Sequence, residues 1–164
     1  MNTLVVYDSQ FGNTERIAQT IAVALTADGQ SRACPVKNAS TLDLEGLDLI
    51  MFGSPTQAWK ATDGIRSFLA RIPSGSLAGH FAASFDTRLH GPALITGSAA
   101  RTIVGTLKHL GFDVLAPAES FFVRGREGPL DDSETARAAN WARHIQSIYV
   151  ERCLTQEAGL VPPH

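Results

Sequence analysis

The sequence predicts an α/β fold in which a parallel β-sheet is covered by helices on both faces. Short runs rich in β-branched and aromatic residues alternate along the chain with longer segments of helical spacing. The runs are almost continuously apolar, as strands buried on both faces must be. The 164 residues, 44% of them hydrophobic and 18% charged, suit one globular domain that needs no disulfide or metal to fold.

The chain begins with a predicted strand and helix. Thr3–Tyr7 is a compact run of branched and aromatic residues, and a polar loop follows it. Ile17, Ile21 and Leu25 then recur at helical spacing, and Gly29 ends that helix. The polar loop is therefore expected to join the carboxyl end of a strand to the start of a helix.

Two further strands and a helix come next. Arg32–Val36 is a weak strand whose Pro35 indicates the edge of the sheet, because proline has no N–H for a strand ladder. Leu47–Phe52 is a third, strongly apolar strand. A helix is expected over Asp63–Ile72, where Pro73 stops it.

The second half of the chain repeats the alternation. Phe81–Phe85 is the fourth expected strand, and Gly97–Leu110 is a helix that ends at Gly111. The fifth strand lies within Phe112–Val123 and is expected to break at Pro117.

The last helix opens at Asp131–Glu134, where acidic side chains suit the positive end of the helix dipole. Trp141 and Ile145 follow at helical spacing and are expected to face the core. We expect residues 1–154 to form a single domain. Residues 155–164, which end in two prolines and a histidine, are expected to form a C-terminal tail.

Charge and motif content exclude several classes of function. The 14 Lys and Arg against 16 Asp and Glu give a net charge of -2 with no basic run, which excludes a nucleic-acid partner. Cys34 and Cys153 form no Cys-x-x-C motif and are expected to be reduced thiols. The histidines show no metal-site spacing and Gly-x-Ser-x-Gly is absent, so no metal ligand and no catalytic residue is predicted.

The sequence lacks the pattern of a secreted or membrane protein. Its first residues include no basic segment ahead of an apolar one, and no apolar run approaches the roughly 18 residues that span a bilayer. The expected location is the cytoplasm, with no membrane partner.

In an open parallel sheet, ligands bind beyond the carboxyl ends of the strands. The first such loop, Ser9–Thr14, places polar side chains around Gly12 at the start of a helix, so that backbone N–H groups and hydroxyls can bind an anion. The loop matches neither G-x-x-x-x-G-K-[ST] nor G-x-G-x-x-G, which disfavours a nucleotide hydrolase and a dinucleotide site. The alternative is an ordinary turn in which a side chain caps the helix.

Two more loops are expected at the same edge of the sheet. Trp59, in the loop Gly53–Lys60, is an aromatic residue among polar ones, and we expect it to stack on a planar ligand rather than pack over the sheet. The loop Ser84–Pro92 carries polar residues that could bracket the edge of a heteroaromatic ring. Alternatively, Arg88 does no more than pair with Asp86.

Together the three loops resemble the flavodoxin family, and the resemblance covers nearly the whole chain. The family's phosphate loop, [ST]-x-[ST]-G-x-[ST], is matched at Ser9, Gly12, Asn13 and Thr14. Trp59 stands where the family has an aromatic residue over one flavin face. The resemblance implies a three-layer α/β/α sandwich with a five-stranded parallel sheet in the order 2-1-3-4-5. It also implies an FMN cofactor and electron transfer between redox partner proteins, a reductase and an electron acceptor.

The resemblance assigns the cofactor site to residues of all three loops. The implied FMN-binding residues are Ser9, Gln10, Phe11, Gly12, Asn13, Thr14, Pro55, Thr56, Gln57, Ala58, Trp59, Phe85, Asp86, Thr87, Arg88 and His90. Phe11 replaces a hydroxyl residue of the family, and Leu89 replaces the tyrosine expected over the second flavin face. The second loop has no glycine between Trp59 and Gly64, which predicts weak stabilisation of the one-electron-reduced flavin.

Two other functions fit parts of the pattern. A flavodoxin-like NAD(P)H:quinone or FMN reductase needs an open flavin face, which Leu89 would leave, and consumption of NAD(P)H separates it from an electron carrier. An FMN-free regulatory module is the other alternative. A phospho-acceptor domain would need paired acidic residues after the first strand and Asp after the third, whereas this chain has Asp8 alone and Ser54.

Overall fold

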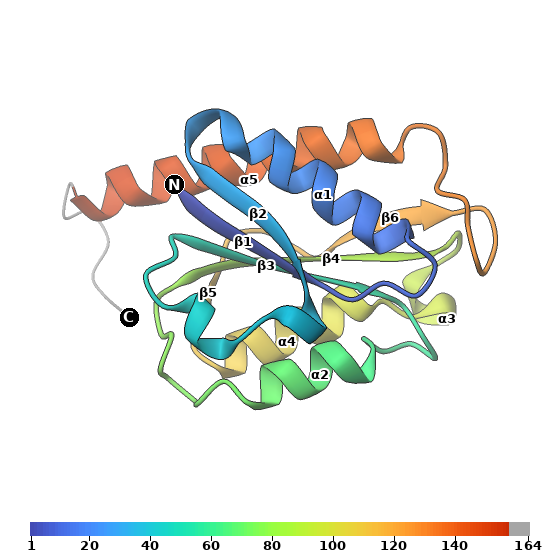
Figure 1. Ribbon diagram of the computed structural model, residues 1–164, viewed down its shortest axis with the longest axis horizontal. Helices are drawn as coiled ribbons and strands as arrows, with labels where there is room; N and C mark the ends of the chain where they lie inside the picture. Colours follow the sequence, from blue (N-terminus) through green and yellow to red (C-terminus); the bar gives the residue numbers. More distant parts are fainter. Residues whose placement is uncertain (158–164) are drawn as a thin grey trace.

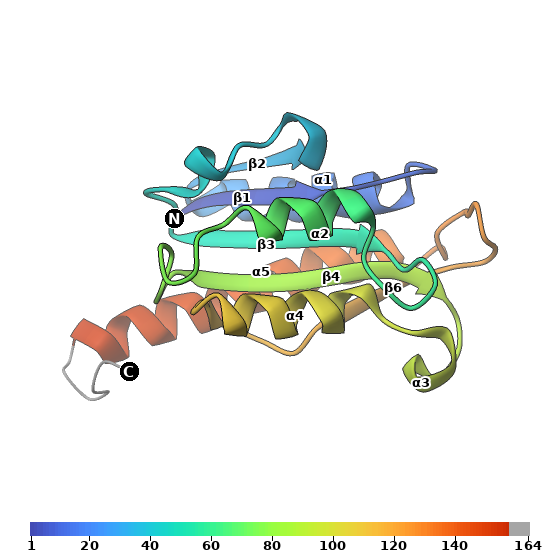
Figure 2. The same ribbon diagram turned by 90° about the horizontal axis from the view of Figure 1, so that it is seen from below.

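One parallel sheet forms the centre of the computed structural model, which describes residues 1–157 apart from the side chains of residues 28 and 157. The strand order is β2-β1-β3-β4-β5, and Figure 2 shows β2, β1, β3 and β4 side by side. The α/β class and the order 2-1-3-4-5 are therefore confirmed. The strands are β1 Asn2–Tyr7, β2 Gln30–Pro35, β3 Leu49–Pro55, β4 Phe81–Leu89, β5 Asp113–Val114 and β6 Glu119–Val123.

The fifth position of the sheet is shared by two strands. β5 pairs with the start of β4 and β6 with its end, where Leu89 lies opposite Val123. The predicted break is confirmed, because Pro117 lies between the two strands. As a result, β6 accompanies β4 to the carboxyl edge of the sheet.

Helices cover both faces of the sheet, with α1 and α5 on one side and α2 and α4 on the other (Figure 1). The helices are α1 Asn13–Leu25, α2 Asp63–Ala70, α3 Ala93–Thr96, α4 Ala99–His109 and α5 Glu134–Glu157. Short 3₁₀ turns lie at Thr26–Asp28, Val36–Asn38 and Thr41–Leu44. The element α3 was not predicted.

Several helix boundaries differ from expectation. α1 ends at Leu25, ahead of Gly29, and α2 ends at Ala70 rather than at Ile72. α4 begins at Ala99 rather than at Gly97, because Gly97 has a positive φ of 76° and the Ser98 side chain caps the helix by accepting from the Arg101 N–H. α5 continues to Glu157, three residues beyond the expected end of the domain. The remainder of the expected tail, residues 158–164, lies outside the described residues.

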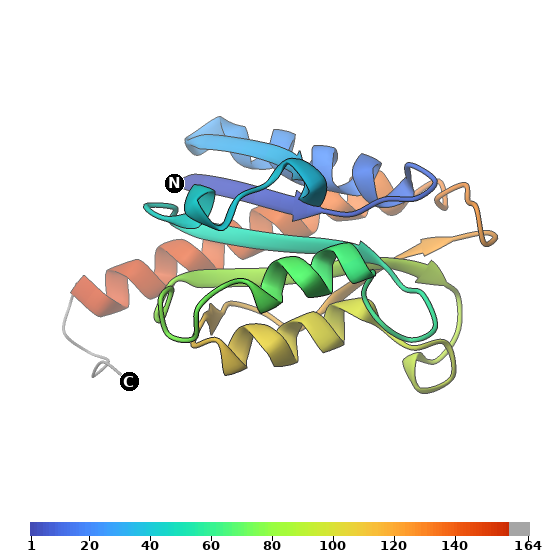
Figure 3. The same ribbon diagram turned by 60° about the horizontal axis from the view of Figure 1, so that its bottom comes forward.

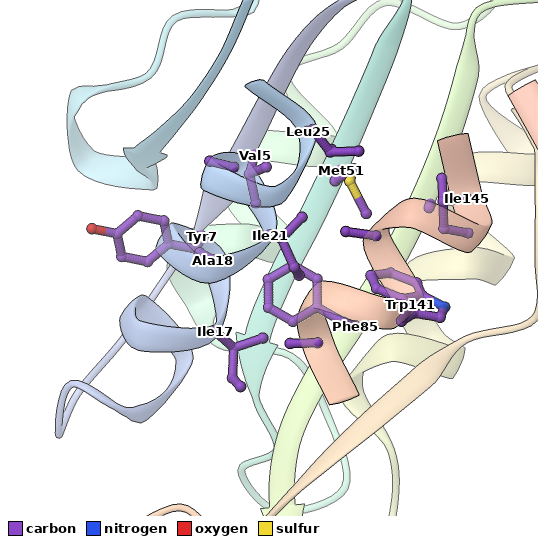
Figure 4. Close-up of a cluster of buried hydrophobic side chains, with 14 of the residues drawn as sticks. Val5, Tyr7, Ile17, Ala18, Ile21, Leu25, Met51, Phe85, Trp141 and Ile145 are labelled. Carbon is purple, nitrogen blue, oxygen red and sulfur yellow. The ribbon is translucent and has the colours of Figure 1, made fainter. Parts of the chain in front are cut away.

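The core beneath α1 and α5 contains aromatic as well as aliphatic residues, among them Phe85 and Trp141 (Figure 4). Phe85, Phe121 and Trp141 meet edge to face with ring centroids 6.0–6.1 Å apart. The prediction that Trp141 belongs to the core is confirmed, since it is 9% exposed. The close approach of Phe85 to β3 depends on Gly53, where a Cβ would lie within 2.8 Å of three carbons of the Phe85 ring.

Candidate functional site

A cavity of about 670 Å³ lies at the carboxyl ends of the strands, among the loops that follow β1, β3, β4 and β6. Figure 3 shows that β3, β4 and β6 end on the same side of the sheet. All predicted site residues line it except Gly12, Phe85, Asp86 and His90. The lining residues are Ser9, Gln10, Phe11, Asn13, Thr14, Pro55, Thr56, Gln57, Ala58, Trp59, Thr87, Arg88, Leu89, Ile95, Thr96, Val123 and Arg126. The three loops singled out in the sequence therefore meet at one cavity.

The loop between β1 and α1 presents unbonded backbone amides. Gly12 precedes α1 with a φ of 82°, and the helix has no side-chain cap, so the alternative of a side-chain-capped turn does not describe this loop. The backbone N–H groups without an acceptor among the described residues are those of Gln10, Phe11, Asn13, Thr14 and Glu15. Such amides at a helix N-terminus bind anions well.

Side chains anchor this loop at both ends. The Thr14 and Thr87 hydroxyl oxygens are 2.8 Å apart in a buried hydrogen bond that ties the start of α1 to β4. The Tyr7 hydroxyl donates to Glu15 Oε1 at 2.9 Å, tying α1 to the end of β1. Burial, aided by the Glu15 carboxylate, raises the pKa of Tyr7 to about 12, so this donor stays protonated at neutral pH.

Trp59 lies in a tight turn after β3. The backbone N–H groups of Gln57 and Lys60 each donate to the other's carbonyl oxygen at 2.9 Å. The two central residues, Ala58 and Trp59, have φ values of 44° and 67°, the left-handed geometry of a type I′ turn. For residues other than glycine this backbone geometry costs about 1–2 kcal/mol each. The loop thus contains positive φ values without a glycine. The weak stabilisation of the one-electron-reduced flavin, predicted from the missing glycine, stays a prediction.

The Trp59 ring rests against the α3 segment instead of packing over the sheet. Its indole N–H donates to the Ile95 carbonyl at 2.6 Å, and its backbone bridges to Gly97. The side chain remains 62% exposed and lines the cavity. A flat aromatic surface is therefore held in place and open to a planar ligand.

Replacing Ala58 by glycine is expected to stabilise the protein. Glycine removes the strain of the left-handed conformation, and this gain exceeds its entropic cost in the unfolded chain, leaving a net gain of about 0.5–1 kcal/mol. Urea denaturation measures the free energy of unfolding. The control is Ala39→Gly, where φ is -87° and glycine should destabilise. Equal losses of stability in both variants would contradict the assigned turn geometry.

Asp86 lies behind the cavity wall rather than in it. It is fully buried, and one carboxylate oxygen, Oδ2, accepts three hydrogen bonds. The donors are Thr56 Oγ1 at 3.1 Å, Ser98 Oγ at 2.7 Å and the Ala100 N–H at 3.0 Å. The other oxygen, Oδ1, is 3.9 Å from Arg88 Nε. Asp86 thus fastens the loop after β3 to the start of α4.

Arg88 lines the cavity as a fixed, nearly buried cation whose side chain is 9% exposed. Its guanidinium lies over the Phe122 ring, 5.0 Å from the ring centroid. It donates to Ser120 Oγ at 3.0 Å, the Gly91 carbonyl at 2.8 Å and Thr96 Oγ1 at 2.7 Å. The pairing with Asp86, raised above as an alternative, is present, and its carboxylate offsets the charge of Arg88. Arg88 nevertheless also lines the cavity.

Two other predicted residues also lie outside the cavity. Phe85 points into the core against Phe121 and Trp141, because alternate residues of a strand face opposite sides of the sheet. His90 is turned toward the loop after β6, with its Nε2 2.5 Å from Asp131 Oδ2. Both side chains therefore pack around the site and do not line the cavity.

Sequence reasoning missed four lining residues. Ile95 and Thr96 belong to α3, which is too short for a periodic signal. Val123 and Arg126 come from the end of β6 and the loop beyond it. The rule that ligands bind at carboxyl strand ends applies to this fourth loop as well and would have found it.

The cavity lining includes two arginines and no acidic residue. Among the side chains that the structure describes, no cluster of His, Cys, Asp or Glu could hold a metal ion. None of the described helices is both long and apolar enough to cross a membrane.

Comparison with solved structures shows the same fold. Oxidised flavodoxin 2 from Bacillus cereus matches with a TM-score of 0.76 and 23% identity, over 93% of this chain and 99% of that one. A flavodoxin from the domain Archaea matches with a TM-score of 0.73 and 19% identity, over 90% and 99% of the two chains. A WrbA-like flavodoxin from Agrobacterium tumefaciens matches with a TM-score of 0.72 and 17% identity, over 92% and 98%.

Sequence comparison points to the same family. No curated protein matches this chain. A family model described as a flavodoxin domain matches residues 4–90, more than half of the chain. The chain therefore belongs to the flavodoxin family.

Proposed function

We propose that this protein binds FMN and carries electrons between redox partner proteins. The observation that carries the proposal is the pairing of two features in one cavity. Unbonded amides at the start of α1 suit a phosphate group, and the exposed face of Trp59 suits a flat ring. FMN combines these two chemical groups, and membership of the flavodoxin family supports it as the ligand.

The described residues fit FMN by the chemistry of their donors and surfaces. The amides of Gln10, Phe11, Asn13 and Thr14 would hold the phosphate, with the N-terminal end of the α1 dipole adding positive potential. Trp59 would lie against the ring, and Leu89 and Ile95 add apolar surface to the cavity lining. When bound, FMN supplies the electron chemistry, and the protein sets its position and surroundings.

Binding of FMN is tested by the absorption spectrum of the purified protein before and after FMN is added and the sample is desalted. We expect retained oxidised-flavin bands, reduction by dithionite, and reoxidation by an added one-electron acceptor protein. Replacing Trp59 by alanine is expected to weaken FMN binding about tenfold or more, in the range found for stacking of aromatic rings on bases. The control is Phe68→Leu, a core substitution on α2 that lies outside the cavity lining. Wild-type protein that retains no flavin would refute the proposal.

A flavodoxin-like reductase that uses NAD(P)H directly is the second candidate. Leu89, at 46% exposure, leaves part of the cavity without an aromatic cover. The surplus of arginine over acidic residues in the lining also suits an anionic dinucleotide. Oxidation of NADH or NADPH by the FMN-loaded protein alone, with a quinone as acceptor, would favour the reductase. Absence of that activity, with electron transfer to an acceptor protein retained, would favour the carrier.

A further inference from the structure

Arg126 places a positive charge on the cavity that no residue of the described chain neutralises. It lies in the loop between β6 and α5, lines the cavity and is exposed. No hydrogen bond or ion pair engages its side chain within residues 1–157. Arg124, two residues earlier, is instead paired with Asp131 at 3.5 Å and Asp132 at 2.6 Å. Arg124 is therefore paired with carboxylates of its own surroundings, whereas Arg126 is unpaired among the described residues.

The loop that carries Arg126 packs against the start of α1. The Asn13 side-chain amide donates to the Glu127 carbonyl at 2.9 Å. At Gly128 a Cβ would lie 2.7 Å from Asn13 Oδ1, so the backbone of this loop approaches α1 closely. Arg126 therefore enters the cavity on the side where the amides of α1 are unbonded.

The loop between β1 and α1 has little else with which to balance a phosphate. Phe11 has no side-chain donor, and the Thr14 hydroxyl is engaged with Thr87. No lysine or arginine occurs within Ser9–Thr14. A phosphate monoester carries about -1.5 to -2 charges at neutral pH, whereas a helix N-terminus supplies only about +0.5. An arginine beside the loop would balance much of the remaining charge, because arginine binds phosphate through paired donors.

We propose that Arg126 binds the phosphate of the flavin and makes the site select FMN over riboflavin, which has no phosphate. The inference rests on the proposed function and goes beyond it by assigning the charge-bearing ligand to the loop after β6. Phe11 stands where the family has a hydroxyl donor, and Arg126 supplies a donor from a different loop of the same chain.

The test measures dissociation constants for FMN and for riboflavin with wild-type protein, Arg126→Gln and Arg126→Lys, with Arg124→Gln as the matched control. Arg126→Gln is expected to weaken FMN binding about tenfold or more, as for loss of a hydrogen bond to a charged group, and to leave riboflavin binding unchanged. Arg126→Lys should restore part of the FMN affinity. Arg124→Gln should bind both flavins as the wild type does. The salt dependence of FMN binding should fall only in Arg126→Gln.

The outcomes separate this inference from the proposed function. Equal weakening of both flavins in Arg126→Gln would give Arg126 a structural role, and unchanged FMN binding would leave it outside the site. Either result overturns the inference while FMN binding by the wild type stands. A wild-type protein that binds neither flavin would refute the proposed function, and the inference with it.

Discussion

Gly97→Ala is expected to weaken FMN binding without unfolding the protein. Gly97 has a φ of 76°, and a Cβ there would lie within 2.6 Å of three atoms of Trp59, including its backbone Cα. The turn that carries Trp59 must then move away from the α3 segment, which breaks the hydrogen bond from the indole to Ile95. Because the ring would no longer be held against the cavity, we expect FMN affinity to fall about tenfold or more.

The matched control for this variant is Gly79→Ala. Gly79 has a φ of 80°, but a Cβ there would meet nothing within 4 Å, and it does not line the cavity. Gly79→Ala bears a backbone penalty of about 1 kcal/mol. The penalty of Gly97→Ala is larger, about 1–3 kcal/mol, because its φ of 76° and ψ of 175° lie in a region that almost only glycine adopts. Both penalties are measurable as a lower free energy of unfolding. Titration with FMN should separate them, with Gly79→Ala binding as the wild type does. Normal FMN affinity in Gly97→Ala would show that the contact between Trp59 and Gly97 does not position the ring.

Removal of the Asp86 carboxylate is expected to give the largest loss of stability among the polar residues around the site. Asp86→Ala would leave the donors on Thr56, Ser98 and Ala100 without an acceptor and Arg88 without its carboxylate. Breaking a buried pair in this way costs about 3–5 kcal/mol, measured by urea denaturation of the flavin-free protein.

Two further variants define the cause of that loss. Asp86→Asn keeps the shape and one acceptor but directs an amide group toward Arg88 or toward the donors, so an intermediate loss is expected. Asp63→Asn removes an exposed carboxylate that pairs with Arg66, and such a pair contributes about 0–1 kcal/mol. Were Asp86 a direct flavin ligand without a structural role, Asp86→Ala would match the wild type in stability without flavin.

Local sequence patterns predicted most of the fold, because the apolar runs, helical periodicity and prolines that define its strands and helices lie within short segments of the chain. Continuous apolar runs identified the buried strands, and the helical stripe through Trp141 identified a core-facing helix. Pro117 predicted the break that divides β5 from β6, since proline lacks a ladder donor. The short α3 has too few residues to show a period and was not predicted.

The site was predicted as a set of loops more successfully than as a set of side chains. The rule for parallel sheets selects strand ends, and those loops do enclose one cavity. It does not tell which side of a strand each residue faces once the sheet is twisted and packed. β4 continues to Leu89, beyond the strand end expected at Phe85, so Phe85 and Asp86 lie within the strand. Phe85 therefore faces the core and Asp86 a buried network.

By itself, the sequence determined the class of fold, the strand order implied by its family resemblance, and the edge of the sheet where a ligand site lies. Only the tertiary structure decided that Trp59 occupies a left-handed turn held by Ile95, and that Arg126 reaches the cavity from a loop more than a hundred residues beyond Asn13. The physical reason is that strands and helices follow from periodic patterns of neighbouring residues. The chemistry of the cavity depends on contacts between distant segments, which no local pattern records.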